Sequence, residues 1–153
     1  LVEGFDQEVS RRELETVLRG SIPMAIATAS SEAKSNVTYV SRVHIVDDER
    51  IALSNQFLGK TKRNLAENPR ASLLAICPST YSQYRIDVTF EQSLRSGSVF
   101  DELRKDIQAL AALGPTTKHF ELLSADVFRV IGRSFETTLT SAKRADRNHR
   151  PFP

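Results

Sequence analysis

The first regular pattern of hydrophobic positions along the chain predicts a helix. Ser10 and Glu13 have the spacing of a capping box, and three apolar residues follow them at helical intervals. We therefore expect a helix over residues 8–19, ended by Gly20. Two further helices are expected: a short one over residues 61–67, before Asn68-Pro69, and a longer one over residues 98–113, before Gly114-Pro115.

Between these helices the hydrophobic period changes to two, which is typical of β-strands. The predicted strands cover residues 22–29, 36–46, 50–55, 71–77, 83–90 and 125–131. Polar turns join most consecutive strands without a helical crossover, so the strands are expected to form antiparallel hairpins. The predicted fold class is mainly β with α (α+β), an antiparallel meander that curls into a barrel flanked by short helices.

Chain length and composition are those of an ordinary globular domain. The 153 residues suffice for one hydrophobic core without disulfides or metals, and Cys77 is the single cysteine. Because Cys77 ends an apolar run, we expect it to be a small buried hydrophobe, and we expect no metal site. The chain has no apolar run long enough for a membrane span and no signal peptide, so we expect a cytoplasmic location and no membrane partner.

The net charge of +2 belongs to one end of the chain. Residues 134–153 carry four basic and two acidic groups, whereas residues 1–133 carry 17 of each sign. We therefore expect a folded domain over residues 1–133 and a basic tail or linker over residues 134–153. Since the folded part has no excess of basic residues, no nucleic-acid partner is expected.

A cluster of cations marks the expected start of the short helix. Lys60, Lys62 and Arg63 surround Thr61 there, although the positive end of a helix dipole disfavours cations. Bound phosphate would offset that penalty and use the free N–H groups of the first turn, whereas a solvated basic face is the alternative. Gly59-Lys60-Thr61 also resembles the end of a P-loop, but Ser54 occupies the position of its other glycine, so a triphosphate site is not expected.

Other polar groups are candidates for a pocket near this helix. Ser54, Asn55 and Gln56 leave the preceding strand together, and they either shape a turn or line a pocket wall. Gln83 and Arg85 share one face of a later strand, where Arg85 could instead pair with Asp87.

The sequence does not reveal catalytic side chains. His44 shares a strand face with Arg42 and Thr38, and a lone strand histidine is more often structural than catalytic. We find no nucleophile elbow and no carboxylate pair for acid–base work, so catalytic residues stay unassigned. This pattern fits a protein whose bound cofactor carries out the chemistry.

The order and spacing of these motifs resemble the pyridoxamine-phosphate-oxidase-like FMN-binding split-barrel family. The resemblance rests on residues 22–76, from IPMAIATA to RASLLAI, and extends more weakly through SQYRI and LLSADVFRVIG. It implies a split barrel in which Lys60 and Thr61 hold the FMN phosphate, with Ser54 and Asn55 beside them. Family members are usually homodimers that bind two flavins between their subunits.

The resemblance also implies contacts with the flavin ring. The segment from Tyr39 to His44 would follow the ring through its backbone, with His44 where relatives often have a lysine, and Gln83 would reach the flavin. The residues expected to bind the cofactor are Tyr39, Val40, Ser41, His44, Ser54, Asn55, Gln56, Lys60, Thr61, Lys62, Gln83 and Arg85.

Two departures from the family pattern bear on the activity. Lys60-Thr61 replaces an Arg-Lys pair at the phosphate, and residues 144–153 do not match the substrate-binding segment of true pyridoxamine-phosphate oxidases. We therefore expect a flavin-dependent oxidoreductase that acts on another small molecule or a nicotinamide donor. The alternatives are a non-catalytic flavin-binding or sensory module of a larger protein, and a relative that binds deazaflavin or haem.

Overall fold

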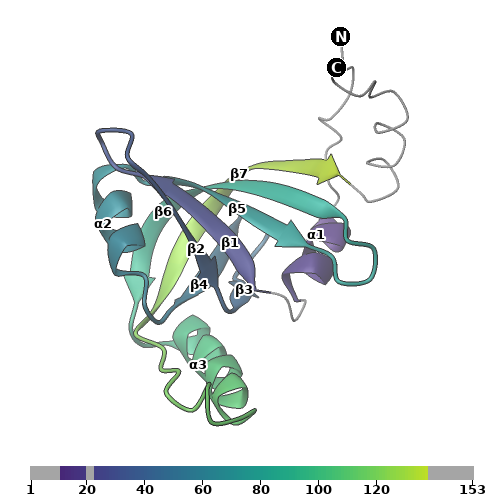
Figure 1. The fold of residues 1–153 in the computed structure, drawn as a ribbon, viewed down its shortest axis with the longest axis vertical. Coiled ribbons are helices and arrows are strands. Elements are labelled where there is room, and N and C mark those ends of the chain that lie inside the picture. The colour runs from purple at the N-terminus through teal and green to yellow at the C-terminus, as the bar shows by residue number, and fades with distance from the viewer. Residues whose placement is uncertain (1–10, 20–22, 138–153) are drawn as a thin grey trace, which may run out of the picture.

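The computed structural model describes residues 11–19 and 23–137, which form one antiparallel sheet with three helices (Figure 1). In chain order the elements are α1 (Arg11–Leu18), β1 (Met24–Ala29), β2 (Ser35–Val40), β3 (Val43–Ile45), β4 (Arg50–Asn55), α2 (Gly59–Glu67), β5 (Arg70–Ile76), β6 (Gln83–Leu94), α3 (Ser98–Ala111) and β7 (Ser124–Thr137).

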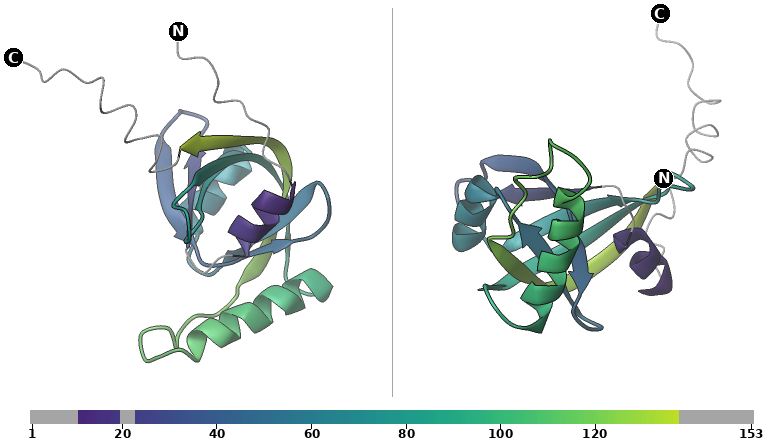
Figure 2. Two further views of the ribbon diagram at one scale, coloured as in Figure 1. Left: turned by 90° about the vertical axis from the view of Figure 1, so that its right-hand side faces the viewer. Right: turned by 90° about the horizontal axis from the view of Figure 1, so that it is seen from below.

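The sheet has seven strands in the order β2-β1-β5-β6-β7-β4-β3, and every pairing is antiparallel. The consecutive strands β2 and β3 lie at opposite edges of this order, so the sheet must curl until its two edges approach each other. Figure 2 shows this curled sheet, with α1 at its mouth and α3 outside it. The prediction of a mainly β, antiparallel split barrel flanked by short helices is confirmed.

The apolar residues form two cores, one on each side of the sheet. The barrel interior contains the side chains of Ile26, Leu53, Leu73 and Ile86, all with no exposed surface, and α1 closes one end of it. A second core lies outside the barrel, where α3 packs on β4 and β7 through Ala52, Leu103, Ile107 and Val127. No described helix covers the outer face of β1, β2 and β5 in the same way.

The prediction of one long strand over residues 36–46 is wrong, because the chain leaves the sheet at Ser41 and Arg42. Ser54 of β4 fixes this break: its N–H donates to the Arg42 carbonyl at 3.0 Å, and its Oγ accepts from the Arg42 N–H at 3.0 Å. The break lets the chain pass from the first strand of the sheet to the last. We refer to residues 41–42 as the strand break.

Several predicted boundaries also move. Helix α2 begins at Gly59 instead of Thr61, α3 ends two residues earlier than expected, and β6 and β7 run on to Leu94 and Thr137 because they pair with each other over most of their length. Residues 134–137 of the expected tail therefore belong to β7. Ser10, Gly20 and residues 138–153 lie outside the described residues.

The expectation that Cys77 is a buried hydrophobe is wrong. Strand β5 ends at Ile76, so Cys77 begins the turn to β6 and is only half-buried. Its Sγ lies 3.2 Å from the Oγ of Ser79. Hydrogen bonds from Ser79 and then Thr80 lower the pKa of the Cys77 thiol to about 7.

Candidate functional site

The first turn of α2 follows directly from the end of β4 and presents unpaired backbone donors. The N-cap residue Leu58 provides no side-chain cap, and the N–H groups of Gly59, Lys60 and Thr61 have no partner within the described part of the chain. The Lys60 side chain is exposed beside them. This combination is suited to an anion, because donors and a cation converge where the helix dipole is positive.

The three polar residues before this turn have different surroundings, although all three are buried. Ser54 holds the strand break. Asn55 donates to Ser124 Oγ at 3.0 Å and accepts from the Leu58 N–H at 3.2 Å, which shapes the entry into α2. Gln56 is 6% exposed, and its Nε2 has no hydrogen-bond partner within the described residues. Of the three, Gln56 is the one with a buried polar atom that lacks any hydrogen-bond partner within the described residues.

Thr61 points away from the exposed surface of the first turn. It is 1% exposed, and its Oγ1 accepts a hydrogen bond from Asn36 Nδ2 at 3.0 Å. One helical turn later, Asn64 Nδ2 donates to Thr28 Oγ1 at 3.1 Å. These bonds fasten α2 to β1 and β2. Sequence reasoning missed Asn64, although its spacing of three from Thr61 places both on one helical face.

Lys62 also turns away from the first turn, toward β7. Its Nζ lies 3.3 Å from Asp126 Oδ1 and 2.8 Å from Ser93 Oγ. Asp126 is 1% exposed, and Ser93 and Ser124 also donate to its Oδ1 at 2.7 and 2.8 Å. Sequence reasoning missed Asp126, whose signal is a carboxylate inside the apolar run Ala-Asp-Val-Phe.

Arg63 returns to the start of the helix. Its Nη1 lies 3.9 Å from the position that a Cβ would occupy on Gly59. Side chains on a helix lean toward its N-terminus, so a residue four positions along covers the turn before it. The exposed cations at the first turn of α2 are therefore Lys60 and Arg63.

The residues expected along the flavin ring have different surroundings before the strand break and within it. Tyr39 is 74% exposed on the outer face, whereas Val40 is buried in the barrel core. The carbonyl of Ser41 accepts from Arg42 Nη1 at 3.2 Å, and the backbone of Arg42 is bonded to Ser54.

His44 faces α3 rather than α2. It lines a cavity of about 320 Å³ together with Arg42 and Asp106. It also lies near Glu102 of α3, since the pKa of Glu102 is lowered mainly by Lys105 and more weakly by His44. The structure does not bring His44 to the first turn of α2.

Gln83 and Arg85 lie on the far side of the sheet from that turn. The register aligns Tyr39, Ala25, Leu74 and Arg85 in one row across β2, β1, β5 and β6. Three interstrand spacings separate Tyr39 from Arg85 by about 14 Å. Arg85 Nε lies 3.6 Å from Asp87 and its Nη1 lies 3.4 Å from Glu136. Arg85 thus has the alternative ion pair with Asp87 that the sequence indicated.

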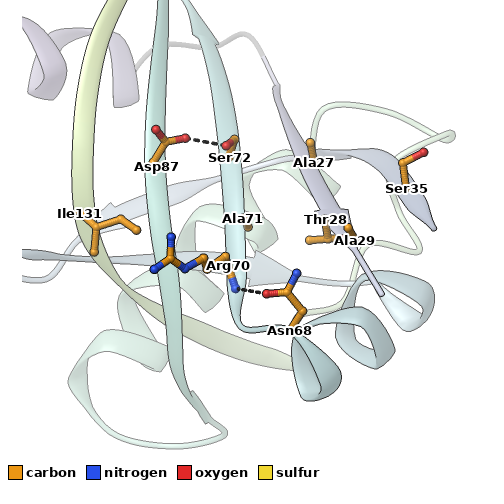
Figure 3. A pocket seen from close by; sticks show the side chains of 10 residues that line it. All are labelled: Ala27, Thr28, Ala29, Ser35, Asn68, Arg70, Ala71, Ser72, Asp87 and Ile131. Carbon is orange, nitrogen blue, oxygen red and sulfur yellow. Dashed lines mark hydrogen bonds between the residues drawn. The ribbon is translucent and has the colours of Figure 1, made fainter. Parts of the chain in front are cut away.

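The outer face of this sheet is hollowed, as Figure 3 shows. A cavity of about 510 Å³ has small side chains at its floor, including Ala27, Ala29 and Ser72. The cation of Arg70 and the carboxylate of Asp87 also line it, with Ser72 donating to Asp87. Exposed Val37, Tyr39, Leu74 and Ile131 belong to the same strands. We call this surface the outer face.

Two further observations concern only residues 11–19 and 23–137. No group of three histidine, cysteine or acidic side chains gathers there in a way that could hold a metal ion. None of the helices within these ranges has the length and apolar character needed to cross a membrane.

Comparison with known proteins gives a family match. Residues 10–133 match the family model described as pyridoxamine 5'-phosphate oxidase. No curated protein matches the chain.

Solved structures share the fold at low sequence identity. An FMN-binding protein from Syntrophomonas wolfei is 21% identical, with a TM-score of 0.67 over 84% of this chain and 89% of that one. An F420 reductase is 17% identical, with a TM-score of 0.56 over 78% and 94% of the two chains. The haem storage protein HutZ from Vibrio cholerae is 16% identical, with a TM-score of 0.51 over 84% and 94%.

Proposed function

The chain belongs to the pyridoxamine 5'-phosphate oxidase family, and from this premise we propose that it binds FMN and acts as a flavin-dependent oxidoreductase on a small molecule. The observation that carries the proposal is the first turn of α2, with its three unpaired N–H groups. FMN ends in a phosphate, and such a group is the usual ligand of a helix N-terminus.

The residues around this turn fit a phosphate group. Lys60 is exposed and adds a charge-assisted donor to the backbone N–H groups. Gln56 has a buried amide donor without a partner within the described residues, and an unmade bond of this kind is costly. Thr61 contributes its backbone N–H. Its Oγ1 accepts a hydrogen bond from Asn36, which fixes α2 against β2.

The flavin ring extends from the phosphate along the strand break in this proposal. The break leaves Ser41 and Arg42 outside the sheet, beside the buried hydroxyl of Ser54. Because both backbone groups of Arg42 are bonded to Ser54, Ser41 is the residue of the break that would contact a ring edge. The bound FMN would supply the redox chemistry, and the chain would supply its position and electrostatic surroundings.

We also propose that the active form is a homodimer formed through the outer face. Gln83 and Arg85 lie on this face, about three strand spacings, or about 14 Å, from Tyr39, so they serve a flavin held by a second copy better than their own. Exposed Val37, Tyr39 and Leu74 would be covered by the partner. Arg70 and Asp87 have opposite charges, which suits a two-fold interface in which each meets the other.

Mass spectrometry of the small molecule released from denatured protein tests the proposal. Released FMN is the expected result, and release of no flavin from protein reconstituted with excess FMN would contradict it.

Anaerobic mixing of the flavin-loaded protein with NADH, NADPH or small-molecule donors then tests for turnover. Bleaching of the flavin absorbance indicates an oxidoreductase, whereas no bleaching with any donor indicates a binding or sensory module. The proposed cytoplasmic location is tested by fractionating cells.

Haem and deazaflavin are the competing ligands, since structural neighbours include a haem storage protein and an F420 reductase. A Soret band in the absorption spectrum of the purified protein would indicate that the ligand is haem and not FMN. A released molecule with the mass of a deazaflavin would likewise set the FMN proposal aside while keeping the fold.

A further inference from the structure

Of the three cations at the start of α2, one is paired with a carboxylate and two are not, among the residues that the structure describes. Lys62 is paired with Asp126, at 3.3 Å between Nζ and Oδ1, and its side chain is 33% exposed. Lys60 and Arg63 are exposed, and neither side chain has an ion pair or hydrogen bond within residues 11–19 and 23–137. One acidic group therefore balances one of the three cations.

The surroundings of Asp126 hold Lys62 in place. Asp126 lies in β7 and is 1% exposed, and its Oδ2 has no hydrogen-bond partner in the described part of the chain. Its hydrogen bonds within the described residues come from Lys62, Ser93 and Ser124, and all three reach Oδ1. Loss of Lys62 would leave a buried carboxylate without a counter-charge, which is strongly destabilising. Lys62 is therefore not free to turn toward a ligand.

The Arg63 side chain lies near the first turn of α2, whereas the Lys62 side chain points away from it. Its Nη1 lies 3.9 Å from the Cβ position of Gly59, and Gly59 has no side chain to hold it away. The unpartnered Nε2 of Gln56, in a residue that is 6% exposed, lies in the segment that enters the same turn. A buried donor without a partner is costly, so binding of an acceptor such as a phosphate oxygen near Gln56 would be favourable.

We infer that Arg63, together with Lys60, supplies the cationic side chains for the phosphate, and that Asp126 keeps Lys62 as a structural cation. The inference rests on the proposed function. Lys60 and Arg63 give two uncompensated positive charges, and a phosphate monoester carries about −1.5 to −2 at pH 7. The guanidinium of Arg63 also matches the geometry of phosphate oxygens in a way that a lysine does not.

Binding of FMN and riboflavin to the full-length apoprotein, followed by quenching of flavin fluorescence, tests the inference. The two ligands differ only in the phosphate, so the ratio of their dissociation constants isolates the phosphate contacts. Arg63→Gln should weaken FMN binding at least about tenfold and leave riboflavin binding unchanged, since it removes a charge-assisted bond.

The matched control is Lys62→Met combined with Asp126→Asn, because this pair removes both charges and avoids a stranded carboxylate. The double variant should keep the FMN to riboflavin ratio within about twofold of the original. A double variant that loses the preference for FMN, or Arg63→Gln that keeps it, would overturn the inference. An unaltered protein that binds FMN no better than riboflavin would instead contradict the proposed function.

Discussion

Individual side chains of α2 fix the helix to the sheet. Lys62 joins α2 to β7 through buried Asp126, and Thr61 joins it to β2 through Asn36. Both residues belong to the cationic segment that first suggests a ligand site, yet their side chains stabilise the fold. The ligand-facing role passes to their neighbours Lys60 and Arg63.

Replacing Lys62 alone should therefore lower the stability of the protein. Lys62→Met leaves Asp126 buried without its counter-charge, and we expect a loss of about 2 kcal/mol, below the cost for a fully buried pair because Lys62 is partly exposed. Urea denaturation measures this free energy of unfolding. Lys105→Met removes the exposed pair with Glu102 and should cost much less, because water screens an exposed ion pair. Equal losses in the two variants would contradict the account of Asp126.

The thiol of Cys77 should react as a partly ionised group at neutral pH. Its pKa is lowered from 9.0 to about 7, chiefly by Ser79, and the thiolate is the reactive form. The rate of alkylation should rise with pH and reach half its maximum near pH 7. Ser79→Ala should move that midpoint upward, whereas Ser31→Ala, in a distant turn, should not. A midpoint near pH 9 in the unaltered protein would refute the lowered pKa.

At the scale of elements, the cations of α2 have opposite effects on the stability of the ligand-free helix and on phosphate binding. Its first turn carries cations that the helix dipole disfavours, and bound phosphate removes that conflict. Lys60→Glu should stabilise the ligand-free protein by about 0.3–1 kcal/mol and should weaken FMN binding. Thermal unfolding without ligand and an FMN titration measure the two effects.

The control for this charge reversal is Lys118→Glu, in an exposed segment after α3. It makes the same change in net charge and should alter neither quantity. If Lys60→Glu destabilised the ligand-free protein or left FMN binding intact, the dipole argument would fail.

The element boundaries show what sequence patterns can and cannot predict. Alternating residues predicted the sheet because one face of each strand packs in the barrel. The strand break could not be predicted, since the alternation continues through Ser41 and Arg42, and the contacts that break the strand come from Ser54. The start of α2 at Gly59 was missed because glycine is a poor helix former.

The candidate site was predictable to the same extent. The anion-binding turn follows from local order: a strand end, a helix start and a cluster of cations. Which cation is free depends on Asp126, which lies 64 residues after Lys62 and meets it only through the pairing of β7. The separation of Gln83 and Arg85 from that turn likewise depends on strand order.

At the scale of the whole molecule, the outer face should bury its apolar side chains against a second copy. Leu74→Asp would place a carboxylate within that interface and should shift dimers toward monomers in sedimentation equilibrium, because burial of an unpaired charge is costly. Flavin content should fall with it, since the partner's residues complete the proposed site.

Leu113→Asp is the matched control for the dimer. Leu113 is 77% exposed, just beyond the end of α3, so the same substitution there should leave the association state unchanged. A dimer that persists in Leu74→Asp would place the interface elsewhere.

The most direct measurement is a crystal structure of the chain grown with FMN. The phosphate should lie within about 3 Å of the N–H groups of Gly59 and Lys60, with the side chains of Lys60 and Arg63 around it. A bound FMN whose phosphate lies elsewhere, with the first turn of α2 facing only water, would contradict the account.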